Sequence, residues 1–193
     1  MIQFTGAVRL VLKRMEAELP TELHYHNVAH TKDVYRAARR IAAGEKLDDH
    51  QTRLVLTAAM LHDMGFVLGI EDHEERSCQL AGEILPKYHY MPEEIAEVQR
   101  IIMVTKLPQN PKDMLEKVMC DADLDYLGRD DYFSISDRLL KEWNQQGRNI
   151  RQEEWYDIQV GFLSIHRYFT ATCQADREPG KQRNLRLVQS GGR

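Results

Sequence analysis

The chain has 193 residues, of which 42% are hydrophobic and 29% charged, and its formal net charge is -4. These values are ordinary for one soluble globular domain, and the lack of a basic excess argues against a nucleic-acid polymer as partner. Its apolar runs are too short to cross a membrane, and its N-terminal residues lack the regions of a signal peptide. Three widely separated cysteines form no C-x-x-C pair, which predicts a reducing, cytoplasmic location.

Hydrophobic periodicity predicts helix along nearly the whole chain, and no strand-like alternation is sustained. The third helix is expected to be central and buried, because residues 54–61 are apolar on every side. Pro92 is a favourable first-turn residue for the fifth helix. In chain order, the eight predicted helices cover roughly residues 4–18, 28–44, 49–62, 73–85, 92–105, 112–127, 132–143 and 152–175.

The eighth predicted helix is long, and its apolar stripe is most simply core packing. His166 shares this face, and a core histidine is a better interpretation of it than a site residue. Residues after Asp176 are polar and basic. One helical domain over 1–176 and a mobile or partner-docked tail over 177–193 are therefore expected. The stripe consists of Trp155, Ile158, Phe162, Ile165 and Phe169.

Two histidines, His26 and His30, stand four residues apart around the start of the second helix. That spacing predicts two imidazoles one turn apart on one helix face. Most histidines are not metal ligands, so the pair alone is better explained as surface or capping groups.

His62 and Asp63 end the most buried of the predicted helices. An unpaired carboxylate in such a place costs on the order of several kcal/mol. Asp63 therefore needs a compensating group, which is a metal ion, an arginine or the backbone amides of the following turn.

Three aspartates, Asp121, Asp123 and Asp125, lie near the end of the sixth helix. At about 100° per residue, Asp123 edges the apolar stripe of that helix, while Asp121 points further away. Asp123 is therefore the candidate ligand, and Asp121 a supporting or capping residue. A solvated acidic patch is the alternative. The glycine and terminal glutamate of an EF-hand loop are missing.

Together His30, His62, Asp63 and Asp123 can converge on one divalent metal ion. Imidazole nitrogens and carboxylate oxygens suit Mn, Fe, Co, Ni, Zn or Mg. The sequence has no G-x-S-x-G elbow, P-loop, dinucleotide fingerprint or H-E-x-x-H motif. A metal-dependent enzyme is the hypothesis that remains.

These segments resemble the HD-domain superfamily of metal-dependent phosphohydrolases, which is named for its His-Asp pair. The family pattern H…HD…D matches His30, His62-Asp63 and Asp123 in order. Residues 73–77, 105–106 and 162–170 are also similar to a bacterial HD subfamily. The resemblance covers roughly residues 20–175.

The resemblance implies an all-α helical bundle with one metal ion at its centre. It also implies hydrolysis of a phosphoester in a small, nucleotide-like substrate, by a water that the metal activates. His26 resembles the leaving-group acid of the cyclic nucleotide phosphodiesterase branch, which shares the Tyr-His-Asn-x-x-His element. His73 and Lys106 are expected at the same cavity, where Lys106 can neutralise phosphate.

Two departures from the family narrow these expectations. The guanosine tetraphosphate hydrolases and deoxynucleoside monophosphatases of the superfamily carry a glutamate where this chain has Phe66. Dinuclear members add further histidines, and this chain has Thr105 and Lys106 where one is expected. One metal ion is therefore expected, with any second ion held weakly through His73 and waters.

Two alternatives stay open. One is a regulatory HD module that senses a nucleotide or a metal without turnover, and the other is a di-iron oxygenase on the same scaffold. A homo-oligomer is compatible with the sequence. The substrate and the native metal are not specified by it.

Overall fold

The computed structural model describes residues 2–191 of the chain. These residues contain ten α-helices and three short 3-10 helices, joined by turns and loops, and they form no strand. The all-α helical bundle predicted from the sequence is confirmed. No helix in this part of the chain is both long and apolar enough to span a membrane. The elements are α1 (Phe4–Glu18), α2 (Val28–Gly44), α3 (Asp49–Leu61), η1 (Met64–Val67), α4 (His73–Ile84), η2 (Leu85–Tyr88), α5 (Pro92–Met103), α6 (Met114–Asp123), η3 (Asp125–Gly128), α7 (Tyr132–Gln145), α8 (Gln152–Ile165), α9 (Ala171–Asp176) and α10 (Glu178–Gln189).

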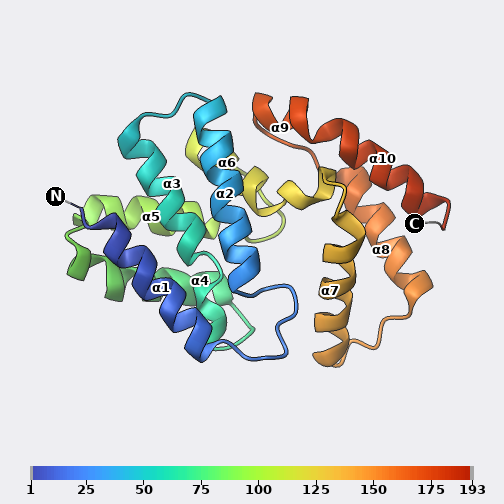
Figure 1. Ribbon diagram of the computed structural model, residues 1–193, viewed down its shortest axis with the longest axis horizontal. Coiled ribbons are helices and arrows are strands. Elements are labelled where there is room, and N and C mark those ends of the chain that lie inside the picture. The colour runs from blue at the N-terminus through green and yellow to red at the C-terminus, as the bar shows by residue number, and fades with distance from the viewer. Residues whose placement is uncertain (1, 192–193) are drawn as a thin grey trace.

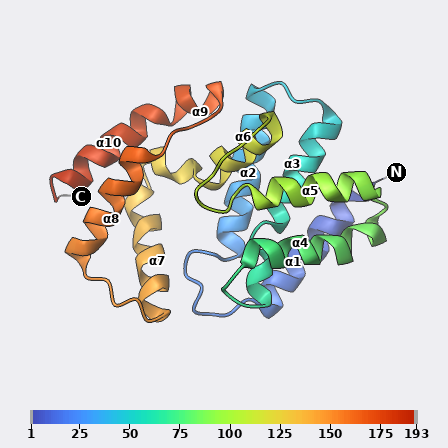
Figure 2. The ribbon, with the colours of Figure 1, turned by 180° about the vertical axis from the view of Figure 1, so that it is seen from behind.

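Helices α1 to α6 gather on one side of the molecule, and α7, α8 and α10 lie on the other (Figure 1). Figure 2 shows that α4 and α5 cover the rear of the first group. Helix α3 is its centre and packs against α1, α2, α5 and α6. Every residue from Leu54 to Leu61 is buried, as the apolar pattern predicted. A capping box starts this helix, because the Asp48 carboxylate accepts the Gln51 N–H at 2.8 Å.

Two buried hydrogen bonds join α7 to α8 within the second group. The Tyr132 hydroxyl donates to Gln159 Oε1 at 2.5 Å, and Trp155 Nε1 donates to Ser136 Oγ at 3.0 Å. Aromatic rings with a polar atom need such partners when they are buried. These bonds set the separation of the two helices, which matters for the cavity described below.

The prediction of one unbroken helix over 152–175 is wrong. The chain leaves the helical conformation at His166, where ψ is 139°, and α9 begins five residues later. Asp121 holds this break, because its carboxylate accepts the backbone N–H groups of Phe169 at 2.9 Å and Thr170 at 2.8 Å. The Thr170 hydroxyl also donates to Asp121 at 2.6 Å. Asp121 therefore supports the segment between α8 and α9, and a supporting role for it at the metal site stays a prediction.

The stripe expected to form core on α8 is only partly buried. Trp155 is buried, whereas Ile158 is 41% and Ile165 77% exposed. Helix α8 ends at Ile165, and among the described residues the chain after His166 does not bury this side chain. The periodicity identified a helix here, but it did not show how much of that helix other elements bury.

Residues 178–189 form α10, which differs from the mobile or partner-docked tail expected from their polarity. This helix packs against α8 and η3. The buried Lys181 ammonium donates to the His166 carbonyl at 2.6 Å, and the Asn184 amide donates to the carbonyls of Leu127 and Arg129, each at 2.9 Å. The polar residues of α10 thus find partners within the protein. Residues 192–193 of the predicted tail lie outside the described residues.

Replacing Asp121 by Ala should lower the free energy of unfolding by about 2–4 kcal/mol, because two backbone N–H groups and a hydroxyl lose their acceptor. Chemical denaturation measures this loss. Asp130 is a matched control, since its carboxylate is 93% exposed and pairs with Arg183 at the surface. Asp130→Ala should change the stability by less than about 0.5 kcal/mol. Equal losses in the two variants would contradict the role given to Asp121.

Candidate metal centre

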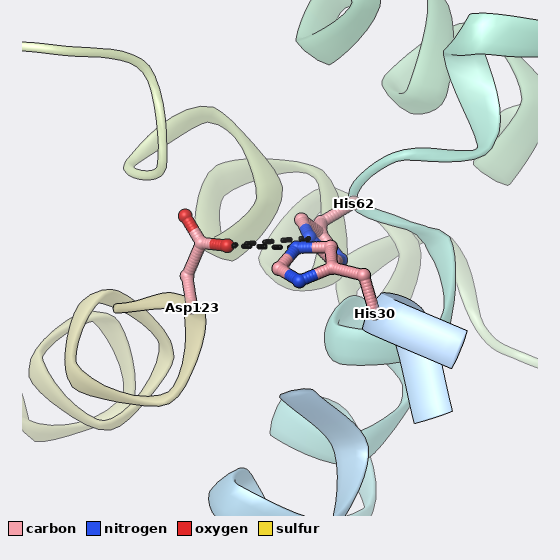
Figure 3. A group of neighbouring side chains, drawn as sticks. All are labelled: His30, His62 and Asp123. Carbon is pink, nitrogen blue, oxygen red and sulfur yellow. Dashed lines mark hydrogen bonds and ion pairs between the residues drawn. The ribbon is translucent and has the colours of Figure 1, made fainter. Parts of the chain in front are cut away.

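The four predicted ligands come from three separate segments and meet at one point. His30 lies on α2, His62 and Asp63 follow the central helix α3, and Asp123 is the last residue of α6. Figure 3 shows His30, His62 and Asp123 pointing toward one another. Asp123 Oδ1 lies 3.3 Å from His30 Nε2 and 3.5 Å from His62 Nε2, and the two nitrogens are 3.3 Å apart. Asp63 Oδ2 lies 3.4 and 3.2 Å from the same two nitrogens.

These spacings fit a shared divalent cation. Ligand atoms about 2.1 Å from one metal lie about 3.0–3.4 Å apart when they are neighbours in its octahedral or tetrahedral shell. Asp63 Oδ2 gives a second indication, because it is buried and has no hydrogen-bond partner among the described residues. Such an oxygen is costly unless a charge compensates it. The donor set, two imidazoles and two carboxylates, therefore suits a divalent metal ion.

Local structure aims the two histidines at this point. Asn27 caps α2, and its side-chain oxygen accepts the N–H groups of Ala29 at 2.9 Å and His30 at 3.3 Å. His62 Nδ1 lies 2.9 Å from the Ala59 carbonyl, so this nitrogen carries the proton and donates it. That bond makes Nε2 of His62 the nitrogen that can bind a metal, which is the usual arrangement of a ligating histidine.

The turn after Asp63 needs a glycine. A Cβ atom on Gly65 would lie 2.0 Å from the carbonyl oxygen of His73, so only glycine allows η1 to approach the start of α4 this closely. Ser77 joins the same segments, since its hydroxyl donates to the His62 carbonyl at 2.6 Å and accepts the Gly65 N–H at 2.8 Å. His73 is thereby held beside the His62–Asp63 pair.

The charges of the cluster reinforce one another. Burial opposes ionisation of Asp63 and Asp123, but the neighbouring histidines outweigh it and hold the pKa of both carboxyls well below their usual range. Burial likewise opposes protonation of His62, but the two carboxylates raise its pKa well above its ordinary value. The site therefore favours positive charge, which a divalent ion supplies when it displaces the histidine protons.

His26 reaches the cluster from outside the helix, and this corrects the expectation that it shares a helix face with His30. Asn27 is the N-cap, so His26 precedes α2, and its ring centroid lies 6.0 Å from that of His30. The ring of Phe66 stacks against two imidazoles, and its centroid lies 4.7 Å from that of His26 and 4.1 Å from that of His73. Phe66 thus fixes both rings at the edge of the cluster.

Glu142 on α7 is a site residue that the sequence reasoning missed. Its buried carboxylate accepts the backbone N–H groups of Tyr25 at 2.8 Å and His26 at 3.0 Å, and it binds His26 Nδ1. Burial lowers the pKa of His26, but Glu142 and Asp63 raise it more, and the net shift is upward. The available signal was periodicity, because Glu142 continues a buried stripe that runs through Tyr132 and Ile135.

Two further predicted residues lie at different places. His73 is close to the cluster, with Nε2 3.6 Å from Asp63 Oδ1. Lys106 is not brought to the cluster, which differs from the position expected of it. Its ammonium lies at the surface, 2.5 Å from Glu75 Oε1 and 3.3 Å from Asp72 Oδ1. These two carboxylates on and before α4 compete for the charge that was expected to meet phosphate.

His166 has neither ligand nor catalytic geometry. Both ring nitrogens are buried without a hydrogen-bond partner among the described residues, and burial lowers the pKa of the ring to about 4. The ring packs near Phe162 and Tyr168. This environment is that of the packed, neutral histidine expected from the sequence.

A cavity of about 210 Å³ opens beside the cluster. His26, Asp63, His73 and Asp123 line one end of it, and side chains of α7 and α8 line the other. Two of the candidate ligands, Asp63 and Asp123, are therefore accessible to a small molecule from this cavity, although they lie at the centre of the bundle.

Comparison with known proteins shows what this architecture is similar to. No protein-family model matches the chain. An uncharacterized protein of Clostridium beijerinckii is 37% identical over 81 residues, which are 40% of this chain and 51% of that protein, so the match spans about half of that relative. A crystal structure from an uncultured Thermotogales bacterium, named a predicted HD superfamily hydrolase, matches with a TM-score of 0.63 at 23% identity, over 95% of this chain and 90% of that one. The chain has the HD-superfamily fold.

The HD fold explains why residues so far apart in sequence meet. Helix α3 places His62 and Asp63 in the middle of the bundle. Helices α2 and α6 both pack on α3, and they place His30 and Asp123 beside this pair. The fold and the convergence agree with what the H…HD…D resemblance implied. The role of these residues as ligands stays a prediction.

Replacing Asp63 or Asp123 by Ala should abolish tight metal binding, because each variant removes an anionic oxygen that faces both histidines. Elemental analysis after removal of loosely bound ions measures this. Asp121→Asn is the control from the same helix, and it should keep the metal content of the wild-type protein. Wild-type metal content in Asp63→Ala, or loss of metal in Asp121→Asn, would show that the ligand set is wrong.

Proposed function

We propose that the protein is a metal-dependent HD-type phosphohydrolase, which cleaves a phosphoester of a small substrate, for which the family resemblance alone suggests a nucleotide-like organic group. The observation that carries this proposal is the buried, unpartnered Asp63 Oδ2, which lies within 3.4 Å of two histidine nitrogens at the edge of a cavity. His30, His62, Asp63 and Asp123 would hold one divalent ion, which is Mn, Fe, Co, Ni, Mg or Zn. When bound, such an ion supplies a Lewis acid and an activated water for attack on phosphorus.

Among the protein's own groups, His26 is positioned to supply a proton to the leaving group. Glu142 occupies Nδ1 of His26, so the second ring nitrogen is the one available to the cavity that His26 lines. The raised pKa of His26 favours the imidazolium form, which donates a proton to the departing alcohol oxygen. Stacking on Phe66 keeps the ring in place during this transfer.

A phosphoester and nucleotide panel, assayed with each of the six metals in turn, tests the proposal. Turnover that depends on added metal and is lost with a chelator supports it. The competing hypothesis, a sensing module, keeps the metal and binds phosphorylated ligands without cleaving them. Metal binding with no cleavage of any phosphoester would therefore favour the sensing module.

His26→Ala should keep its metal and lose roughly 100-fold or more in rate, because it lacks the general acid and none of the ligands. Metal analysis and steady-state kinetics on the same sample measure the two properties. Loss of metal and activity together would show that His26 is a ligand or a structural residue.

Glu142→Gln offers a finer test of the same pair. Without the carboxylate the pKa of His26 falls, so the imidazolium is lost at lower pH than in the wild-type protein. The high-pH limb of the kcat profile, where the general acid deprotonates, should move to lower pH. An unchanged pH profile would contradict the positioning role of Glu142.

One tightly bound metal ion per chain is expected. A second ion beside Asp63 would have two nearest protein donors, Oδ1 of Asp63 and Nε2 of His73, and these two atoms lie 3.6 Å from each other. Waters would fill the rest of its coordination shell. Elemental analysis of protein purified without chelators counts the ions. A reproducible value near two irons per chain would overturn the mononuclear proposal and favour the di-iron oxygenase.

A further inference from the structure

The far wall of the cavity is aromatic and aliphatic, and the proposed chemistry does not use it. Trp143 of α7 and Trp155 of α8 meet nearly edge-to-face, with ring centroids 5.2 Å apart and an interplanar angle of 78°. Phe162 extends this wall. Ile158 and Leu107 also line the cavity and remain 41% and 61% exposed, so its mouth is apolar as well. An exposed apolar rim of this kind marks a binding site for an apolar group.

Two pairs of polar groups in this wall are bonded to one another. The Tyr132 hydroxyl is engaged by Gln159, and the Trp155 N–H is engaged by Ser136. A ligand rich in hydroxyl groups would leave many of its own donors and acceptors unpaired there, and unpaired buried polar groups weaken binding.

The charges of the cavity oppose a polyanion. Its lining contains three carboxylates, those of Asp63, Glu74 and Asp123, and no lysine or arginine among the described residues. Arg148 lies over the Trp143 ring, 4.0 Å from its centroid, but is not part of the lining, and Lys106 is paired with Glu75. A second phosphate placed within this cavity would therefore meet no countercharge, although a neighbouring cavity that shares Tyr25, Asp123 and Tyr126 with it is lined by Arg36, Arg129 and Arg138.

We propose that the substrate is a phosphate monoester of an uncharged, largely apolar alcohol, whose organic group lies against Trp143 and Trp155. This inference rests on the proposed function, because the single phosphate must occupy the metal end of the cavity. The size agrees, since a dry cavity of about 150 Å³ binds benzene and this one measures about 210 Å³. Sugar phosphates and nucleoside polyphosphates are the classes that the wall disfavours.

The test compares substrates that release alcohols of similar reactivity. Benzyl phosphate, ribose 5-phosphate and a nucleoside 5′-monophosphate are all esters of a primary alcohol, so differences in kcat/KM report the organic group. Benzyl phosphate should exceed both others by roughly tenfold or more.

Two lysine substitutions on one helix identify the wall. Ile158→Lys places a charge in the lining and should lower kcat/KM for benzyl phosphate by roughly tenfold, with a smaller loss for ribose 5-phosphate. Ile165→Lys is the matched control, because Ile165 is 77% exposed on the same helix and lies outside the lining. It should leave both values unchanged. Both side chains are exposed enough for each variant to fold.

Binding can be followed without turnover. The chain has two tryptophans, and both line this cavity, so its tryptophan fluorescence reports on the proposed wall. Benzylphosphonate, which has no ester bond to cleave, should shift the emission of the Zn²⁺-loaded protein, and ribose 5-phosphate at the same concentration should not. The shift should require a higher concentration in Ile158→Lys and an unchanged one in Ile165→Lys.

The outcomes separate this inference from the proposal beneath it. Equal or faster cleavage of ribose 5-phosphate or the nucleoside monophosphate overturns the apolar substrate class and leaves the phosphohydrolase intact. Equal effects of the two lysine substitutions, or binding of benzylphosphonate without a fluorescence change, also overturn it. Failure to cleave any phosphoester with any metal overturns the phosphohydrolase, and the substrate assignment falls with it.

Discussion

The charge buried at the end of α3 is the constraint on which the rest of the structure depends. Asp63 lies where the central helix of the first group ends, and one of its oxygens has no hydrogen-bond donor in the described residues. An isolated carboxylate in such surroundings is unstable. The bundle offsets the free-energy cost of burying this carboxylate by placing His30 and His62 beside it and by leaving space for a cation. The helices that do this are also the ones that bury the core, so the core and the site share the same packing.

The three neighbouring aspartates near the end of α6 have different roles because of their positions: one faces the candidate metal site, and the other two hold other segments of the fold in place. Asp123 faces the histidines, whereas Asp121 turns the other way and holds the break between α8 and α9. Asp125 is buried at the start of η3 and pairs with Arg40 at 2.6 Å and Arg177 at 2.8 Å, which ties α2 and the segment before α10 to η3. Breaking such a buried pair leaves an uncompensated charge. One acidic run therefore holds the site and both groups of helices together.

Sequence reasoning identified what periodicity and motif carry, and missed what depends on contacts between distant segments. The helices of the first group and the convergence of the H…HD…D residues followed from local pattern and resemblance. The break after α8 depends on Asp121, which lies 48 residues before Phe169. Lys106 was expected at the cavity because its own segment suggested it, but Glu75 and Asp72 on another element hold it outside. The polarity of residues after 176 suggested a tail, although Lys181 and Asn184 have buried partners.

The division of the fold into two groups also divides the work at the site. The first group supplies the candidate ligands and has little freedom to change, since α2, α3 and α6 form the core as well. The second group supplies the far wall of the cavity from α7 and α8, and that wall can vary without disturbing the metal position. Glu142 is the exception, because it lies on α7 but binds the backbone N–H groups of Tyr25 and His26. Through this one carboxylate, the helix that would contact the organic part of the proposed substrate also orients the imidazole proposed to face its reacting end. Selectivity and proton transfer would therefore be physically linked in the proposed enzyme, and a change in α7 that improves the fit of a new ligand would also have to preserve the position of Glu142.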